Sequence, residues 1–532
     1  MKDYIFKTFT GLRKPITLEA CIGTNLYTKE YGILTDFESG CWAAVLGHSH
    51  PEVIEDMMKY TSRLFHTHQY FDTSYPSMLT EIIISSSGLI HDYKGTYLSS
   101  GSEAVSLAIA LAERITGRKK KLSFHISYLS SLPEMKIPRN KENWLDLDII
   151  DCINCRSNCS ECPKFINQDF SEIAAFVFEP GNSGGLVLLP PDQLITFLVE
   201  KVRDAGGLII ANEVTTGFGR TGKWFGFQHY DLLNRLNGPD FISMGKGLGN
   251  GYPVSGLLIR RELADAVEKT NFRHVQSHTN DPLGCIVAKK VVEILTNENL
   301  IAKGAETGEY FRASLEGVKQ RTDGIKEIRG VGLMNAILLK DSIKALEVFE
   351  ALIEKGFFVG FSEEANLLRF YAPLTISRDK IDALMEALES CLLITAEEYK
   401  VHRTVGFHDD KQVTNLLNKT YWAAERTAET VSLSLKNSLC YSVYDQRNSN
   451  KLIGFGRVVT DYSTMYWLCD VVVDESFRGL GIGKKIMESI SSDPRLDGLK
   501  GILATRDAFG LYEKFGFQKD PVKFMGKPRT RN

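Results

Sequence analysis

The chain has 532 residues, of which 43% are hydrophobic and 24% are charged, and its formal net charge at pH 7 is −3. This length predicts more than one domain, and the near-neutral charge argues against nucleic acid or an anionic membrane as a partner. No apolar run approaches the roughly 18 residues that span a bilayer, and residues 1–15 lack the apolar stretch of a secretory signal. We therefore expect a cytoplasmic protein whose 10 cysteines stay reduced.

Residues 20–395 alternate short β-branched runs with helical stretches. Strands are predicted over 174–178, 207–211 and 241–244, and helices over 105–114 and 192–205. This order predicts an α/β domain with a mostly parallel, doubly wound sheet and helices on both faces. Ligands of such sheets bind in the loops that follow the strands, so the polar residues of those loops are the first candidates for a site.

Three of these loops contain residues suited to chemistry. Small polar residues at 99–104 open the helix over 105–114, where backbone N–H groups can bind an anion, although an ordinary serine cap explains the same residues. Asn212 directly follows an apolar strand, and a polar group there needs a partner. Lys246 is flanked by glycines after the next strand, which leaves its amine open to form an imine, although most lysines are solvated surface charges.

Together these loops resemble the class III, fold type I enzymes that use pyridoxal 5'-phosphate (PLP). The resemblance covers most of residues 20–395 in the family's order and spacing. The matching segments are 47–51, 100–102, 179–180, 212–222, Lys246, 280–283, 329–333 and 368–370. It implies a fold type I PLP-transferase domain over residues 1–395, a homodimer with active sites at its interface, and amino acids or amines and keto acids as substrates.

The resemblance also implies a role for each matching residue. Lys246 would bind PLP as an imine and then move the proton at the substrate carbon. Arg369 would bind a substrate carboxylate through two hydrogen bonds. The other cofactor contacts that it implies are Gly101 and Ser102 at the phosphate, Tyr128 on the pyridine ring, Glu179, Asn212 at the pyridine nitrogen, and Ser277 or Thr279 at the phosphate of the partner subunit.

Two departures from the family pattern leave the reaction open. The family has aspartate where Asn212 stands, and losing about 1–2 kcal/mol of stabilisation of the pyridinium would slow carbanion formation roughly 5–30-fold. Members that use ω-amines carry, at the position of Gly184, a glutamate that pairs with the arginine, so Arg369 is expected to be free of that acid. Two alternatives to a transaminase therefore stay open: a PLP-dependent decarboxylase or lyase, and a weakened PLP scaffold beside an active second domain.

Four cysteines, Cys152, Cys155, Cys159 and Cys162, form two C-x-x-C pairs. Four thiolates suit a tetrahedral zinc ion or an iron–sulfur cluster, and the close spacing of the pairs favours the cluster. The alternative is a thiol-rich surface loop that forms disulfides on oxidation. We expect a structural or redox role for this segment rather than catalysis.

The pattern of predicted strands and helices changes at a hinge expected over 395–400. Strands are predicted over 401–407, 439–444, 452–460 and 466–473, and helices over 412–421, 427–435 and 484–490. They predict one compact α+β domain over residues 400–532. Arg478, Gly481 and Gly483 follow the last strand and open the last helix, where N–H groups and the helix dipole favour a pyrophosphate, although a tight strand-to-helix turn explains the glycines equally well.

This glycine-rich turn and the segment 508–517 resemble the GNAT N-acetyltransferases over about residues 401–525. The resemblance implies acetyl-CoA as the cosubstrate and direct attack of an amine on the thioester. Backbone groups of Val472 and Val473 would bind the acetyl carbonyl, and Tyr512 would be the general acid for the departing thiolate. The sequence as a whole thus predicts an aminotransferase fused to an N-acetyltransferase.

Overall fold

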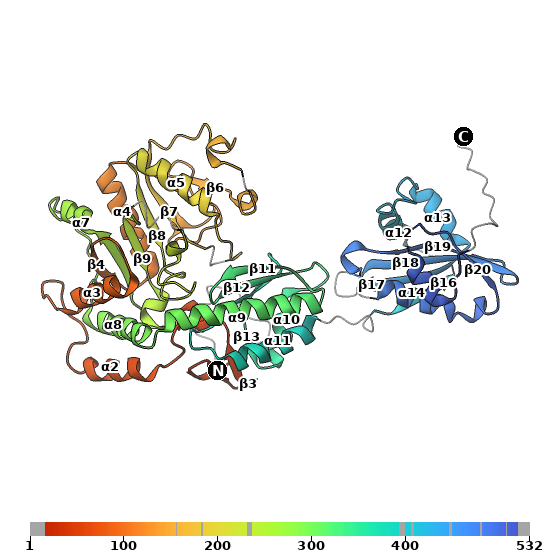
Figure 1. Cartoon of the computed structure of the whole chain (residues 1–532), viewed down its shortest axis with the longest axis horizontal. Helices are drawn as coiled ribbons and strands as arrows, with labels where there is room; N and C mark the ends of the chain where they lie inside the picture. Colours follow the sequence, from red (N-terminus) through yellow and green to blue (C-terminus); the bar gives the residue numbers. More distant parts are fainter. Residues whose placement is uncertain are drawn as a thin grey trace, which may run out of the picture. The chain divides into compact units, whose positions relative to one another are not determined.

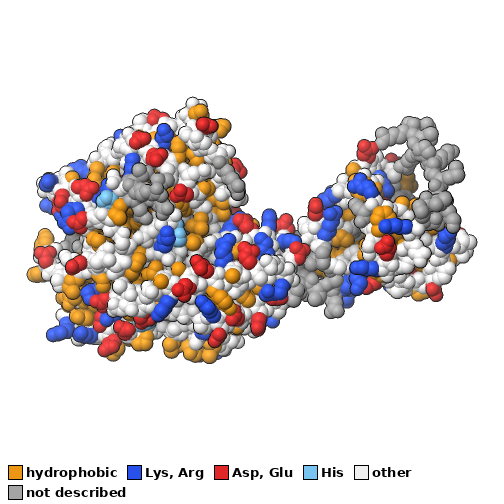
Figure 2. Space-filling model, in the orientation of Figure 1, with side chains coloured by type: hydrophobic (Ala, Val, Ile, Leu, Met, Phe, Trp, Pro, Cys, Tyr) orange, Lys and Arg blue, Asp and Glu red, His pale blue; other side chains and the backbone are white. Residues whose placement is uncertain are grey.

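The computed structural model describes residues 16–155, 157–181, 185–230, 237–392, 399–405, 409–445, 450–478, 481–506 and 508–519. The chain divides into two compact units, and the boundary between them follows Leu392. Most of the hinge expected over 395–400 lies outside the described residues. On the face shown in Figure 2, positive and negative side chains are interspersed over each unit, in keeping with the small net charge.

A seven-stranded sheet of order β4-β10-β9-β8-β7-β5-β6 forms the centre of the first unit (Figure 1). Its strands are β4 (Tyr93–Leu98), β5 (Lys120–Phe124), β6 (Trp144–Leu147), β7 (Ile173–Phe178), β8 (Leu208–Asn212), β9 (Phe241–Met244) and β10 (Ser255–Arg260). All neighbouring pairs from β6 to β9 are parallel, whereas β10 is antiparallel to both β9 and β4. Strand β7 is buried along its whole length, as its unbroken apolar sequence requires. The predicted mostly parallel sheet is therefore confirmed.

Helices pack on this sheet and extend the core. Helix α4 contacts β7, β8, β9 and β10, and α5 contacts β7 and β8. The helices of this unit are α1 (Ser39–Trp42), α2 (Pro51–Thr61), α3 (Tyr75–Ser87), α4 (Gly101–Thr116), α5 (Asp192–Asp204), α7 (Arg261–Glu268), α8 (Pro282–Asn297), α9 (Leu300–Arg321), α10 (Ala345–Glu354) and α11 (Arg378–Leu392). None of the described helices in either unit is both long enough and apolar enough to cross a bilayer.

Two smaller sheets bring the start of the first unit beside its end. One has the order β1-β2-β3-β13 and the other β11-β12-β15-β14. Their strands are β1 (Leu18–Ile22), β2 (Asn25–Thr28), β3 (Gly32–Asp36), β11 (Ile325–Val331), β12 (Met334–Leu339), β13 (Phe357–Phe358), β14 (Gly360–Ser362) and β15 (Leu367–Phe370). Because β3 pairs with β13 in parallel, the residues that follow β3 lie against the segment that follows β13.

The second unit is an α+β domain around a five-stranded sheet of order β16 to β20. Its elements are β16 (Val401–Val405), α12 (Asp410–Leu417), α13 (Ala428–Lys436), β17 (Leu439–Asp445), β18 (Lys451–Thr460), β19 (Met465–Val473), α14 (Ile482–Ser491), β20 (Lys500–Ile502) and α15 (Phe509–Tyr512). The helix predicted over 412–421 ends at Leu417, because the Thr420 hydroxyl donates a 2.6 Å hydrogen bond to the Leu417 carbonyl and closes the last turn.

Candidate active sites

Lys246 lies at the end of β9, at the edge of the central sheet where the parallel strands terminate. Its Nζ donates a 2.6 Å hydrogen bond to Thr215 Oγ1 and lies 4.3 Å from the centroid of the Trp42 ring. Thr215 belongs to the loop after β8, and Trp42 ends α1. The amine is therefore held between three segments that are far apart in the sequence, in the kind of crevice where open α/β sheets bind ligands.

Burial lowers the pKa of Lys246 to about 8, and the charge of Glu179 opposes part of this shift. The neutral amine, which is the nucleophile, therefore dominates above pH 8. We expect the rate at which the apoprotein binds PLP covalently to rise as the pH increases to about 8 and to level off above it. Stopped-flow absorbance between pH 6 and 10.5 measures this rate, and a rate that climbs up to about pH 10, as for an ordinary lysine, would contradict the assignment.

The first residues of α4, Gly101 and Ser102, lie beside Gly245, which precedes Lys246, and form a concave backbone segment that we call the cup. Ser100 caps the helix, and Glu103 Oε2 accepts hydrogen bonds from the Ser99 and Ser100 N–H groups at 3.0 and 2.8 Å. Within the described residues, this leaves the N–H groups of Gly101 and Ser102 for an anion. A Cβ on Gly101 would lie 2.6 Å from a Val214 methyl, so only glycine fits against the loop after β8.

Tyr128, Glu179 and Asn212 lie together at the same edge of the sheet. The Tyr128 N–H donates to Glu179 Oε2 at 3.1 Å, and Asn212 Nδ2 donates to the Tyr128 carbonyl at 3.3 Å. Asn212 Oδ1 accepts from the Val214 N–H at 3.3 Å, so backbone groups on both sides orient the amide. The Tyr128 ring is 52% exposed, and Ser131 in its loop bonds Ser102 through its N–H at 3.0 Å. The structure thus gathers the predicted ring and phosphate contacts around Lys246.

Arg369 lies on β15, with its Cζ 5.2 Å from the centroid of the same Trp42 ring. Its Nη2 is 4.0 Å from Glu38 Oε2, and both side chains are mostly buried. Arg369 therefore has an acid beside it, Glu38 from another segment, whereas the prediction that it lacks the family's acid at position 184 stays a prediction. Gly184, on which that prediction depended, lies outside the described residues. Nothing in the sequence near Glu38 links it to Arg369, since they are brought together by the pairing of β3 with β13 and by the hydrogen bond of the Tyr371 N–H to the Phe37 carbonyl.

Ser277 and Thr279 lie in the loop before α8. Gln276 ties this loop to the cup by donating to Glu103 Oε1 at 3.2 Å. Thr279 lines a cavity of about 780 Å³ together with Phe71. Whether either hydroxyl reaches the phosphate in a partner subunit stays a prediction.

The four clustered cysteines are half-buried free thiols. In each C-x-x-C pair the second cysteine donates its N–H to the carbonyl of the first, at 3.1 and 3.2 Å. Burial, together with the neighbouring thiols, raises the pKa of Cys152 and Cys159. Among the described residues, the three side chains whose ligand atoms are close enough for one ion are His66, His278 and Asp281, and the cysteine sulfurs form no such group. The metal therefore stays a prediction.

In the second unit, the predicted acetyl-CoA residues surround the end of β19. Among the described residues, β19 and β20 pair at 465–467 and 500–502, and this pairing ends before Val472 and Val473. Gly481 caps α14 with a φ of 76°, and a Cβ on Gly483 would lie 3.7 Å from Val473 and 3.8 Å from Leu511. Tyr512, next to Leu511, is half-buried at the end of α15. The end of β19 and the N-terminus of α14 thus lie close together, which suits the pyrophosphate of a donor, and the role of Tyr512 as general acid stays a prediction.

Arg478 ends the short turn after β19 and is exposed, with Nη1 3.8 Å from Glu475 Oε1. Residues 479 and 480, between Arg478 and Gly481, lie outside the described residues. The contact of Arg478 with a pyrophosphate stays a prediction.

Comparison with known proteins identifies the family of each unit. Residues 13–392 match the model of the class-III aminotransferase family, and residues 436–519 match the acetyltransferase (GNAT) domain. The acetylornithine aminotransferase of Methanothermobacter thermautotrophicus is 28% identical over 396 residues, which are 73% of this chain and 96% of that protein. A leucine/methionine racemase of Thermococcus litoralis is 28% identical over 390 residues, covering 67% of this chain and 86% of that protein.

Among solved structures, the acetylornithine aminotransferase from Elizabethkingia anophelis aligns with a TM-score of 0.61 and 27% identity, over 73% of this chain and 96% of that one. The first family model alone spans more than half of the chain. This chain belongs to the class-III aminotransferases and carries a GNAT domain, so it joins a transaminase to an N-acetyltransferase.

Proposed function

We propose that the two units act in sequence on one small amine: the first makes or processes it by PLP-dependent transamination, and the second acetylates it from acetyl-CoA. The observation that carries the proposal is the packing of Lys246 and Arg369 against the same Trp42 ring, which places a reactive amine and a carboxylate-binding cation in one site. Fusion raises the concentration of the first product near the second site. Acetylation removes the nucleophilic amine and so prevents the transamination from reversing.

The residues of the first site fit PLP. The cup at Gly101 and Ser102 suits its phosphate, the exposed face of Tyr128 suits its ring, and Lys246 has a lowered pKa. When bound, PLP withdraws electrons from the substrate carbon. The chain's own residues do the rest: Lys246 moves the proton between substrate carbon and cofactor, and Arg369 orients the substrate by its carboxylate.

The test is a panel of diamines and amino acids incubated with the full chain, PLP, 2-oxoglutarate and acetyl-CoA, followed by mass spectrometry. The proposal predicts that one donor yields glutamate from 2-oxoglutarate and that an acetylated amine accumulates. Acetylation without any amino transfer would leave only the second unit active and would refute the sequential scheme.

A second candidate is a PLP-dependent reaction without amino transfer, such as decarboxylation, elimination or racemisation. Asn212 favours it, because an amide is a weaker partner for the pyridine nitrogen than a carboxylate. The racemase of Thermococcus litoralis shows that a protein of similar sequence and another activity exists. In the same panel, release of CO₂ or ammonia, or inversion detected by chiral chromatography, without new glutamate would select this candidate.

We also propose that the chain works as a homodimer in the cytoplasm. Tyr70, Phe71 and Val275 are 89%, 70% and 82% exposed, and Phe71 lines the cavity that contains Thr279. Large exposed apolar side chains favour burial by a partner, and a second copy would bring Thr279 to another active site. All ten cysteines are free, in keeping with a reducing compartment. Light scattering measures the mass of the protein in solution, and a value equal to one chain, 59.6 kDa, would contradict the dimer.

We further propose that the four cysteines bind a metal, as zinc or as an iron–sulfur cluster. The two identical N–H-to-carbonyl turns support this, because each presents a C-x-x-C pair. Anaerobically purified protein is expected to hold metal by elemental analysis, and Cys155→Ser combined with Cys162→Ser to lose it. The control is Cys391→Ser, outside the loop. Metal-free protein with four titratable thiols at these positions would identify a thiol-rich surface loop instead.

A further inference from the structure

We propose that Glu38 is a specificity-determining residue of the first site, where its carboxylate competes with the substrate carboxylate for Arg369. The inference rests on the proposed role of Arg369 in binding substrate. Glu38 would set how strongly the site prefers substrates with a carboxylate over amines that lack one.

The contacts of Glu38 place it inside the site. Glu38 Oε2 accepts a 2.8 Å hydrogen bond from Trp42 Nε1 and lies 4.0 Å from Arg369 Nη2. The Trp42 ring also lies 4.3 Å from Lys246 Nζ and 5.2 Å from Arg369 Cζ. The Trp42 indole thus contacts the acid, the carboxylate-binding cation and the reactive lysine, so Glu38 lies in the site rather than at a remote surface.

Glu38 is buried, and the described residues supply no hydrogen bond to its Oε1. A Cβ on Gly360 of β14 would overlap this oxygen, so glycine there makes room for the carboxylate. A buried carboxylate is costly unless it is paired. Burial accordingly raises the pKa of Glu38 to about 7, while Arg369 opposes the shift. In the empty site, the charge of Arg369 stabilises the ionised Glu38 carboxylate. When a substrate carboxylate binds Arg369 instead, Glu38 can take up a proton and become neutral.

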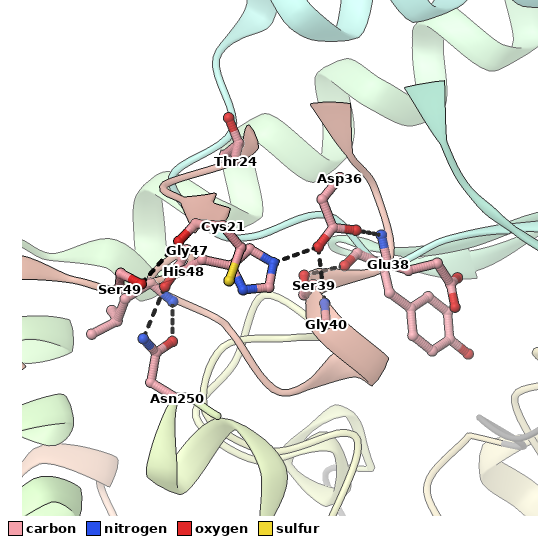
Figure 3. A network of polar contacts seen from close by, with 12 residues as sticks. Cys21, Thr24, Asp36, Glu38, Ser39, Gly40, Gly47, His48, Ser49 and Asn250 are labelled. Atoms are coloured by element: carbon pink, nitrogen blue, oxygen red, sulfur yellow. Dashed lines mark hydrogen bonds and ion pairs between the residues drawn. The ribbon is translucent and has the colours of Figure 1, made fainter. Parts of the chain in front are cut away.

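The nearby Asp36 is engaged elsewhere, as Figure 3 shows. Its carboxylate accepts hydrogen bonds from the Glu38 N–H at 2.7 Å and the Gly40 N–H at 2.9 Å, and its Oδ2 lies 2.7 Å from His48 Nε2. Asp36 therefore fixes the backbone of the turn, which leaves the side chain of Glu38 to face Arg369.

The backbone around Glu38 is held in an uncommon shape. The residues from Ser39 to Trp42 all have positive φ, between 48° and 72°. Consecutive left-handed residues are costly and persist where the surroundings impose them, often at functional sites. Here the Ser39 hydroxyl donates to the Tyr371 carbonyl, and Trp42 N–H donates to the Glu38 carbonyl at 2.7 Å. The turn thus holds both Glu38 and Trp42 close to Arg369.

The test measures binding of glutarate, a dicarboxylate without an amine, to the PLP-loaded full chain by calorimetry. Glu38→Gln keeps the shape and the Trp42 bond but removes the competing charge, so glutarate is expected to bind about tenfold tighter. Glu38→Asp keeps the negative charge but moves it farther from Arg369, so it should tighten glutarate binding by a smaller factor. The charge-matched control is Glu364→Gln, on the exposed turn before β15, which should leave binding unchanged.

A folded Glu38→Gln protein that binds glutarate no more tightly than the native protein would overturn the inference. If that variant does not fold, unchanged binding by Glu38→Asp would overturn it instead. Where an amino donor is known, the same variants should lower KM for carboxylate-bearing substrates more than they change kcat. If no amino transfer is found but glutarate binding tightens, the proposed function fails while the role of Glu38 stands.

Discussion

Replacing Lys246 with alanine is expected to abolish transamination while acetylation by the second unit continues at its native rate. The amine of Lys246 is held by Thr215 and Trp42 in a buried position. Proton transfer by a positioned group contributes about 10²–10⁴-fold, so a loss of at least about 10³-fold is expected when the covalent link to the cofactor is lost as well.

The measurement follows both reactions on the same protein. Glutamate formation from 2-oxoglutarate reports the first unit, and release of free thiol from acetyl-CoA with a preformed amine reports the second. The matched control is Lys269→Ala, an exposed lysine at the end of α7, which should keep both activities. Amino transfer by the Lys246→Ala protein would show that another group performs the chemistry, and loss of acetylation as well would show that the units do not work independently.

Much of this site follows from the sequence, because its main residues come directly after predicted strands. Strand β7 is a continuous apolar run and β8 and β9 are mostly apolar, as buried parallel strands require. Glu179 and Lys246 follow β7 and β9, and Asn212 ends β8, so the three must meet at one edge of the sheet. Local sequence thus fixes both the strand and the place of the residue that follows it.

The contact between Glu38 and Arg369 could not be predicted in this way. It depends on β3 pairing with β13 and on a turn of left-handed residues after β3. Neither feature leaves a periodic signal, since strand pairing across a chain is decided by the packing of the whole unit. The direction of β10 is a similar case, because an apolar run reads the same in a parallel or an antiparallel strand.

Arg220→Met is expected to destabilise the first unit by about 2–4 kcal/mol, because it leaves buried carbonyl groups without their donor. The Arg220 side chain is fully buried. Its Nη1 donates to the Leu333 carbonyl at 3.3 Å and to the Ala372 carbonyl, and its Nη2 donates to Ser39 Oγ at 3.2 Å. Burial lowers the pKa of Arg220 to about 10, so the guanidinium is still charged at neutral pH and bonds these carbonyls strongly.

Urea unfolding of the full chain measures this loss, with the transition of the first unit identified by its shift on adding PLP. Arg321→Met is the control, since Arg321 is exposed and pairs with Glu389 on the surface, where a pair contributes about 0–1 kcal/mol. Equal losses in the two variants would refute the argument. Because Arg220 also bonds Ser39, its removal should loosen the turn that carries Glu38 and Trp42, so the folded fraction of Arg220→Met should discriminate less between carboxylates and simple amines than the native protein does.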